Sequence, residues 1–181
     1  MKNNKVEFLK DILCSDNVVE NIKNNFDTLL TIVPQLVDMK NCNHKHPHHI
    51  GTVLEHTLSA ISFAENDFDI RLVLLLHDMG KPFCYKEIDG VRRFWGHAEK
   101  SAEIAKELLS NIGFNNDYIE YVCSLIKLHD TPISKENIIS DKPFYSTLFK
   151  IQICDALAHN PKYNQKRLQY IENVKKLFEE K

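Results

Sequence analysis

Several histidines and aspartates of this 181-residue chain fall on the apolar faces of predicted helices. His56, His129 and Asp155 each follow an apolar residue by one helical turn, so their side chains are expected to point toward the core. A buried imidazole or carboxylate costs free energy unless it has a partner. The pattern therefore predicts that these groups meet one another, or a shared cation, inside the protein.

A second pair of polar residues, His77 and Asp78, ends the most apolar segment of the chain, residues 70–76. Both side chains are expected to emerge at the base of a cleft, where an adjacent imidazole and carboxylate can share one ion. His97 begins a predicted helix directly after Gly96, whose missing side chain is expected to let neighbouring groups approach closely. We expect His97 to complete the shell of a second ion.

Together these residues form a mixed nitrogen and oxygen ligand set of four imidazoles and two carboxylates. A dication offsets the desolvation of all its ligands at once, which makes a cluster favourable where single buried groups are not. Such a set suits iron, manganese, cobalt or nickel, and zinc or magnesium is also compatible. The predicted ligands are His56, His77, Asp78, His97, His129 and Asp155.

The order of the predicted ligands along the chain resembles the six-ligand signature of the HD superfamily of metal-dependent phosphohydrolases. In that family the first His, the His-Asp pair and the last Asp hold one metal. In two-metal members the two intervening His residues hold the second metal. The resemblance thus implies two ions, with the Asp of the pair, here Asp78, bridging them.

Three segments, 54–58, 75–82 and 94–99, are most similar to the HD domain that follows the nucleotidyltransferase head in bacterial CCA-adding enzymes. The resemblance covers roughly residues 48–159 and implies a 2′,3′-cyclic phosphate or a phosphomonoester as substrate. The first residues of the chain show neither a Gly-Ser strand-turn motif nor paired Asp residues. We therefore do not expect this chain to add nucleotides.

The expected reaction is attack on phosphorus by metal-activated water, which needs no protein nucleophile. We assign catalytic roles to Asp78 and to Lys81, which lies three residues later and is placed to contact a phosphate oxygen as a compact positive charge. Lys81 is therefore also a predicted substrate-binding residue.

Other basic residues flank the predicted ligands. Arg93, His48 and His49 are predicted to bind phosphate or to protonate a leaving oxygen. His44 and His46 lie in the same polar stretch, residues 41–49, and we interpret these two as part of a solvated loop outside the site.

The predicted function is hydrolysis of a phosphate monoester or a (cyclic) phosphodiester of a nucleotide or RNA end. One alternative is hydrolysis of a dinucleoside polyphosphate or an alarmone, because related HD proteins share the ligand signature. A second is a non-catalytic metal-binding signalling module. A third is the oxygen-dependent cleavage of a polyol or phosphonate known for a few di-iron HD proteins.

Helices must position these residues, because only five glycines are available for turns and apolar residues recur at helical spacing. Asp16, Asp117 and Gly113 are candidate caps, and residues 85–95, with Asp89 and Gly90 in the middle, have the composition of a short hairpin or extended loop. The predicted helices are residues 6–13, 18–33, 51–64, 70–76, 97–112, 117–128, a run from 143 through 157, and 162–178.

We therefore predict an all-α, single-domain HD-type bundle, with an N-terminal helical extension (1–40), the HD domain (41–160) and a C-terminal helix packed on it (161–181). A net charge of −2 gives no global attraction to nucleic acid or an anionic membrane. The N-terminus lacks a continuous apolar stretch, and the five cysteines show no paired spacing. These features favour a cytoplasmic protein without a membrane partner.

Overall fold

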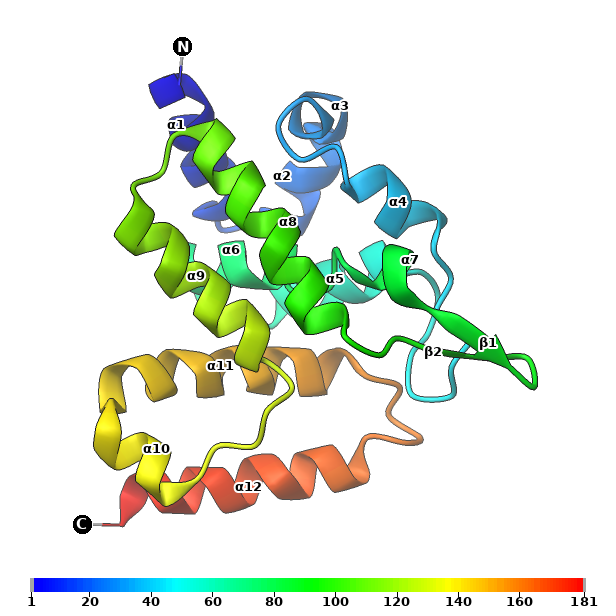
Figure 1. Ribbon diagram of the computed structural model, residues 1–181, viewed down its shortest axis with the longest axis vertical. Helices are drawn as coiled ribbons and strands as arrows, with labels where there is room; N and C mark the ends of the chain where they lie inside the picture. Colours follow the sequence, from blue (N-terminus) through cyan, green and yellow to red (C-terminus); the bar gives the residue numbers. More distant parts are fainter. Residues whose placement is uncertain (1, 181) are drawn as a thin grey trace.

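Helix α6 (Phe68–Leu76) lies in the interior of the protein (Figure 1). The computed structural model describes residues 2–180. Every residue from Ile70 to Leu76 is buried. The Asp67 carboxylate caps the first turn by accepting a hydrogen bond of 3.0 Å from the Ile70 amide. A helix that is buried on all sides must be surrounded by others. Accordingly, α6 contacts α1, α5, α8, α9 and α11.

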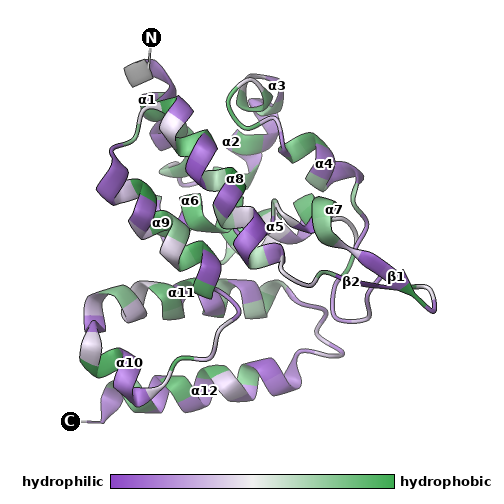
Figure 2. Cartoon of the chain, viewed as in Figure 1, coloured by the Kyte–Doolittle hydropathy of each residue, from purple (hydrophilic) through white to green (hydrophobic). Residues whose placement is uncertain are grey.

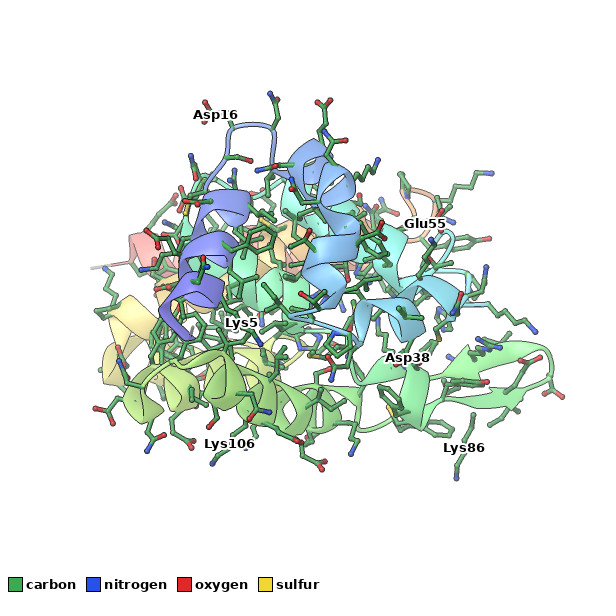
Figure 3. The ribbon with its side chains drawn as sticks, turned by 90° about the horizontal axis from the view of Figure 1, so that it is seen from above. Lys5, Asp16, Asp38, Glu55, Lys86 and Lys106 are labelled. Carbon is green, nitrogen blue, oxygen red and sulfur yellow. The ribbon has the colours of Figure 1, made fainter. Side chains whose placement is uncertain are left out.

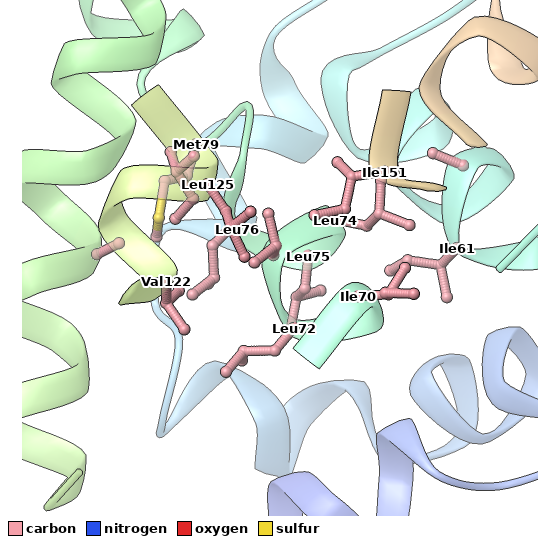
Figure 4. Packing of buried hydrophobic residues seen from close by; sticks show 14 of the residues in the cluster. Ile61, Ile70, Leu72, Leu74, Leu75, Leu76, Met79, Val122, Leu125 and Ile151 are labelled. Carbon is pink, nitrogen blue, oxygen red and sulfur yellow. The ribbon is translucent and has the colours of Figure 1, made fainter. Parts of the chain in front are cut away.

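Two pairs of helices supply most of this surrounding layer. Helices α5 (Val53–Ser62) and α11 (Lys142–Ala158) pack together, and so do the antiparallel helices α8 (His97–Ile112) and α9 (Asn116–Leu128) (Figure 1). Figure 4 shows the leucines of α6 between side chains of α5, α9 and α11. Each fully buried Leu or Ile contributes about 1.5–3 kcal/mol, so this packing fixes the helices that carry the predicted ligands.

The N-terminal helices share this core. Their bounds are α1 (Lys2–Leu13), α2 (Val18–Asn24), α3 (Phe26–Leu30) and α4 (Leu36–Asn41). The buried side chain of Arg71 in α6 joins them to the rest of the fold. Its guanidinium donates to the carbonyls of Leu13 at 2.7 Å, Ser15 at 2.9 Å and Ala64 at 3.2 Å.

The C-terminal part adds α10 (Lys135–Ser140) and α12 (Gln165–Glu179), both packed on α11. Between α6 and α8 lie the short helix α7 (Lys81–Cys84) and an antiparallel hairpin of β1 (Lys86–Ile88) and β2 (Val91–Arg93). The hairpin projects from the body of the protein, where Lys86 marks it in Figure 3, and Figure 2 shows both strands as mainly hydrophilic.

The predicted all-α fold with a short hairpin is confirmed. Asp89 and Gly90 both have positive φ, 50° and 76°, as a tight two-residue hairpin turn requires. The predicted bounds of α8 are also confirmed, including the cap at Gly113 with φ 113°. Within the described residues no helix is long and apolar enough to cross a membrane, and all five cysteines are free thiols.

Some boundaries were predicted wrongly. Residues 18–33 do not form one helix, because the chain breaks at Asn25, whose side-chain amide donates to the carbonyl of Asn21 at 2.9 Å. Asn17, without a side-chain cap bond, precedes α2 instead of Asp16. Asn115, and not Asp117, caps α9 by accepting a hydrogen bond from the Tyr118 amide at 2.9 Å. The last helix begins at residue 165 rather than 162, and α4 and α10 were not predicted.

Candidate metal centre

His56 faces the interior because a capping box fixes the start of α5. The Glu55 amide donates to Thr52 Oγ1 at 3.2 Å, and the Thr52 amide donates to Glu55 Oε2 at 2.6 Å. Because Thr52 caps the helix and α5 begins at Val53, His56 lies one turn after Val53 on the buried face. Its side chain is almost completely buried.

His77 and Asp78 follow the last residue of α6 and are completely buried. The chain then turns at Gly80, whose amide donates to Ser101 Oγ of α8 at 2.9 Å. A side chain at Gly80 would lie 2.6 Å from main-chain atoms of both His97 and Ser101. The absence of a side chain at Gly80 therefore lets the turn after Asp78 pack directly against the first turns of α8.

Three of the predicted ligand histidines are oriented in the same way. The Nδ1 atoms of His77, His97 and His129 lie 2.7, 2.9 and 2.7 Å from the carbonyl oxygens three residues earlier. An Nδ1–H group that donates to a carbonyl leaves Nε2 as the free, metal-ligating nitrogen of a neutral imidazole. Each ring is therefore held with Nε2 turned toward the other predicted ligands.

Four ligand atoms converge in what we call the inner group, defined as His56 Nε2, His77 Nε2, Asp78 Oδ2 and Asp155 Oδ1. His56 Nε2 lies 2.8 Å from Asp155 Oδ1 and 3.7 Å from Asp78 Oδ2. His77 Nε2 lies 3.3 Å from Asp78 Oδ2 and 3.6 Å from Asp155 Oδ1. Neighbouring ligands of one ion with bonds of about 2.1 Å lie roughly 3.0–3.4 Å apart, so the inner group has a spacing suited to one metal ion.

The other oxygen of Asp78 faces an outer group, defined as His97 Nε2, His129 Nε2 and Asp78 Oδ1. The two nitrogens are 3.2 Å apart, and they lie 3.4 Å and 3.9 Å from Asp78 Oδ1, respectively. Asp78 therefore turns one carboxylate oxygen to each group.

The two groups contain polar atoms that a divalent metal would satisfy. His77 Nε2 and Asp78 Oδ1 are buried without a hydrogen-bond partner, while Asp78 Oδ2 is paired with Lys81 Nζ at 2.7 Å. His97 Nε2 and His129 Nε2 face each other although both rings donate through Nδ1. Buried polar groups normally have partners, and a cation between these lone pairs would supply one. The residues therefore fit divalent metal ions.

The charges of the inner group are strongly coupled. Burial alone would lower the pKa of His77, but the carboxylates of Asp78 and Asp155 raise it to about 10. Burial alone would raise the pKa of Asp78, but His77 and Lys81 hold it well below its usual value. The pKa of Asp155 is likewise held low against burial, by the hydrogen bond with His56 and by the nearby His77. The carboxylates thus stay ionised and attract cations.

The structure brings two of the predicted substrate-binding residues to the inner group. Lys81 is buried, with Nζ 2.7 Å from Asp78 Oδ2. The ring of His49 packs against His56, with 4.7 Å between ring centroids. Arg93 and His48 are exposed and lie apart from both groups. The Arg93 guanidinium contacts His46 Nε2 at 3.1 Å, and the His48 ring lies near His46 and Tyr163.

The structure contradicts two expectations, which concern His44 and Gly96. His44 is completely buried rather than solvated, because its amide donates to the Gly51 carbonyl at 3.1 Å and this pairing folds the polar stretch over α5. Burial and the Lys81 charge lower the pKa of His44 to about 2. At Gly96, a side chain would meet open space, so close approach is not the reason for glycine. The backbone there has φ 74°, which favours glycine at the start of α8.

Three polar residues beside the groups were missed. Asp130 Oδ2 lies 3.3 Å from His97 Nε2, the buried His159 ring packs against His56, and Arg167 of α12 contacts Asp155 and Asp130. The His129-Asp130 sequence repeats the adjacency of His77-Asp78 and could have been noticed. No local pattern identifies Arg167, which only the packing of α12 brings to the site.

A helical domain that gathers His and Asp side chains around a His-Asp pair at the end of its central helix defines an HD-type protein. The HD domain family model matches residues 48–171, and the chain belongs to this family of metal-dependent phosphohydrolases. It is also similar to a CC-adding tRNA nucleotidyltransferase from Thermus thermophilus, with 34% identity over 112 residues. The match covers 58% of this chain and 25% of that relative, so the chain spans about a quarter of the relative's length.

Proposed function

We propose that this protein hydrolyses a phosphate monoester or a (cyclic) phosphodiester of a nucleotide or an RNA end. The observation that carries the proposal is the position of Asp78, whose two oxygens face the inner and outer groups separately. In this proposal His56, His77, Asp78 and Asp155 hold one divalent ion, and His97, His129 and Asp78 hold a second. The mixed nitrogen and oxygen ligands favour iron, manganese, cobalt or nickel.

Divalent ions at these positions would lower the pKa of a bound water to about 7 and polarise the phosphoryl oxygens. The protein's own contribution is positioning and charge. Asp78, Asp155 and the four imidazoles would hold the ions, and the Lys81 ammonium 2.7 Å from Asp78 supports the negative charge that develops on a phosphoryl group. His44 Nε2, 3.4 Å from Lys81 Nζ, helps hold that side chain in place.

The substrate would approach from the side of the outer group. The side chains of the inner group are 0–4% exposed, whereas His97 is 14% and Asp130 is 38% exposed. A pocket of about 290 Å³ adjoins this side and is lined by residues that include His129, Asp130, Arg167 and Tyr170. Its size is at the lower end for small-molecule sites, which supports a substrate with a small organic group beside its phosphate.

An RNA end belongs among the candidate substrates because the similar Thermus thermophilus protein is, by its name, a tRNA nucleotidyltransferase. A nucleotide monophosphate and a 2′,3′-cyclic nucleotide present the same phosphate chemistry in a smaller molecule. A substrate panel must therefore contain both free nucleotides and RNA oligonucleotides that end in a phosphate or a cyclic phosphate.

The test is metal-dependent release of product from this panel, with manganese, iron, cobalt, nickel or zinc added to metal-free protein. Dinucleoside polyphosphates and an alarmone are included, so that the products separate ester from anhydride hydrolysis. Asp78→Asn, which keeps the shape and removes the charge, is expected to abolish turnover. Asp38→Asn makes the same change at an exposed position of α4 and is the matched control (Figure 3). Absence of turnover with every metal and substrate would contradict the proposal.

A further inference from the structure

Asp130, the residue directly after His129, places a carboxylate oxygen beside both histidines of the outer group. Its Oδ2 atom lies 3.3 Å from His97 Nε2 and 3.5 Å from His129 Nε2. These separations match those between the outer group's own atoms, 3.2–3.9 Å. Without Asp130 the outer group has only three ligand atoms, one of them on the shared Asp78.

The second oxygen of Asp130 is held by Arg167, which also holds the inner group. Nη2 of Arg167 donates to Asp130 Oδ1 at 2.8 Å, and Nη1 donates to Asp155 Oδ2. Asp130 thus turns Oδ1 to the guanidinium and Oδ2 to the histidines of the outer group. Asp155 turns Oδ2 to the guanidinium and Oδ1 to the histidines of the inner group. A planar guanidinium with its donors in a fixed fork can hold two carboxylates in a defined orientation, whereas the rotatable donors of a lysine ammonium fix no such geometry.

We propose that Asp130 is a fourth protein ligand of the outer ion and that Arg167 is a positioning residue that orients the ligating carboxylates of both ions. The inference rests on the proposed function, because it presumes that the two groups hold divalent ions. It gives the C-terminal helix a role at the metal centre, since Arg167 lies in the first turn of α12.

The two possible roles of Arg167, charge repulsion and positioning, predict opposite changes in metal affinity when Arg167 is replaced. If the guanidinium acted only through its charge, its removal would strengthen the binding of nearby dications. If it orients Asp130 and Asp155, its removal leaves both carboxylates free to rotate. The affinity for both ions then falls, typically by about 10–100-fold when a hydrogen-bonding partner of a ligand is lost. The sign of the change therefore separates the two roles.

The experiment is calorimetric titration of the metal-free 181-residue chain with Co²⁺, accompanied by the visible spectrum of the bound cobalt. Wild type is compared with Asp130→Asn, Arg167→Gln and Arg167→Lys. The matched controls are Asp117→Asn in the first turn of α9 and Lys175→Gln on α12, both exposed and outside the site. Thermal unfolding in the presence of a chelator checks that every variant is folded.

Wild type is expected to bind two Co²⁺ ions. Asp130→Asn is expected to keep the inner ion with its spectrum unchanged and to weaken the outer ion by at least about tenfold. Arg167→Gln and Arg167→Lys are expected to weaken both ions by about 10–100-fold, while the two controls match wild type. Variants of Asp130 or Arg167 that bind both ions as wild type does would overturn the inference alone. A wild-type protein that binds no cobalt would overturn the proposed function together with it.

Discussion

Replacing Gly80 by alanine tests whether the turn after Asp78 is held against α8 as the structure indicates. The backbone at Gly80 has φ −79° and ψ −21°, which any residue adopts. In open space the alanine would therefore stabilise the protein by about 0.4–1 kcal/mol through the unfolded state. Here, however, its Cβ would lie 2.6 Å from the His97 carbonyl oxygen and from the Ser101 amide nitrogen.

Both of these neighbours are main-chain atoms, so α8 must move by about 0.8 Å to restore ordinary contact. Overpacking costs about 1–3 kcal/mol, and the hydrogen bond from Gly80 to Ser101 contributes about 1 kcal/mol more. After the gain of about 0.4–1 kcal/mol through the unfolded state is subtracted, Gly80→Ala is expected to lower the stability by about 1–3.6 kcal/mol and the melting temperature by roughly 5 °C or more. The shift of α8 displaces His97, so the outer ion is also expected to bind more weakly.

The assay is thermal unfolding in a chelator, followed by cobalt titration. Gly90→Ala is the comparison, because Gly90 has φ 76° at the tip of the hairpin with open space around it. It is expected to lose about 1 kcal/mol from backbone strain and to leave metal binding unchanged. A Gly80→Ala protein as stable as wild type, with unchanged cobalt affinity, would refute the reasoning about this contact.

Three further predictions concern charge. Because the pKa of His77 is raised to about 10, metal uptake at pH 8 must displace its proton. Calorimetry in buffers of different ionisation enthalpy should therefore detect release of about one proton per chain, and metal should bind more tightly as the pH rises toward 10. An absence of proton release would contradict this prediction. Lys81→Gln removes an ammonium 2.7 Å from Asp78, so metal binding should tighten while turnover falls; weaker metal binding would argue against this placement. Arg71→Met leaves three main-chain carbonyls without their donor. It should lower the free energy of unfolding, measured in urea, by about 3 kcal/mol and leave the metal stoichiometry unchanged. A decrease below about 0.5 kcal/mol would show that these hydrogen bonds contribute little.

The sequence predicted the helical fold because its strongest signals are local. The apolar run of residues 70–76 could only be a buried central element, and Gly96 and Gly113 bracket α8 at the predicted residues. The six predicted ligands lie in two adjoining groups for the same reason, since each lies on the buried face of a helix or at its end. Their role as ligands remains a prediction that the cobalt experiments test.

What the sequence did not reveal depends on contacts between distant segments. The polarity of residues 41–49 suggested a solvated loop, but pairing of Asn43 with Thr52 buries His44 beneath it. Arg167 lies 12 residues after Asp155 on a different helix, and only the packing of α12 on α11 brings the two side chains together. Capping choices such as Asn115 over Asp117 depend on one residue's backbone conformation, which periodicity does not resolve.

The most direct test of the central claim is a crystal structure of the protein loaded with Mn²⁺ or Co²⁺, with the ions located by anomalous scattering. The proposal predicts two peaks on opposite sides of the Asp78 carboxylate, about 3.5–4 Å apart, one within the inner group and one within the outer group. The ions at both peaks should be coordinated by Nε2 atoms of the histidines. A single ion elsewhere, such as among the histidines of residues 44–49, or no ion at Asp78 would contradict the account.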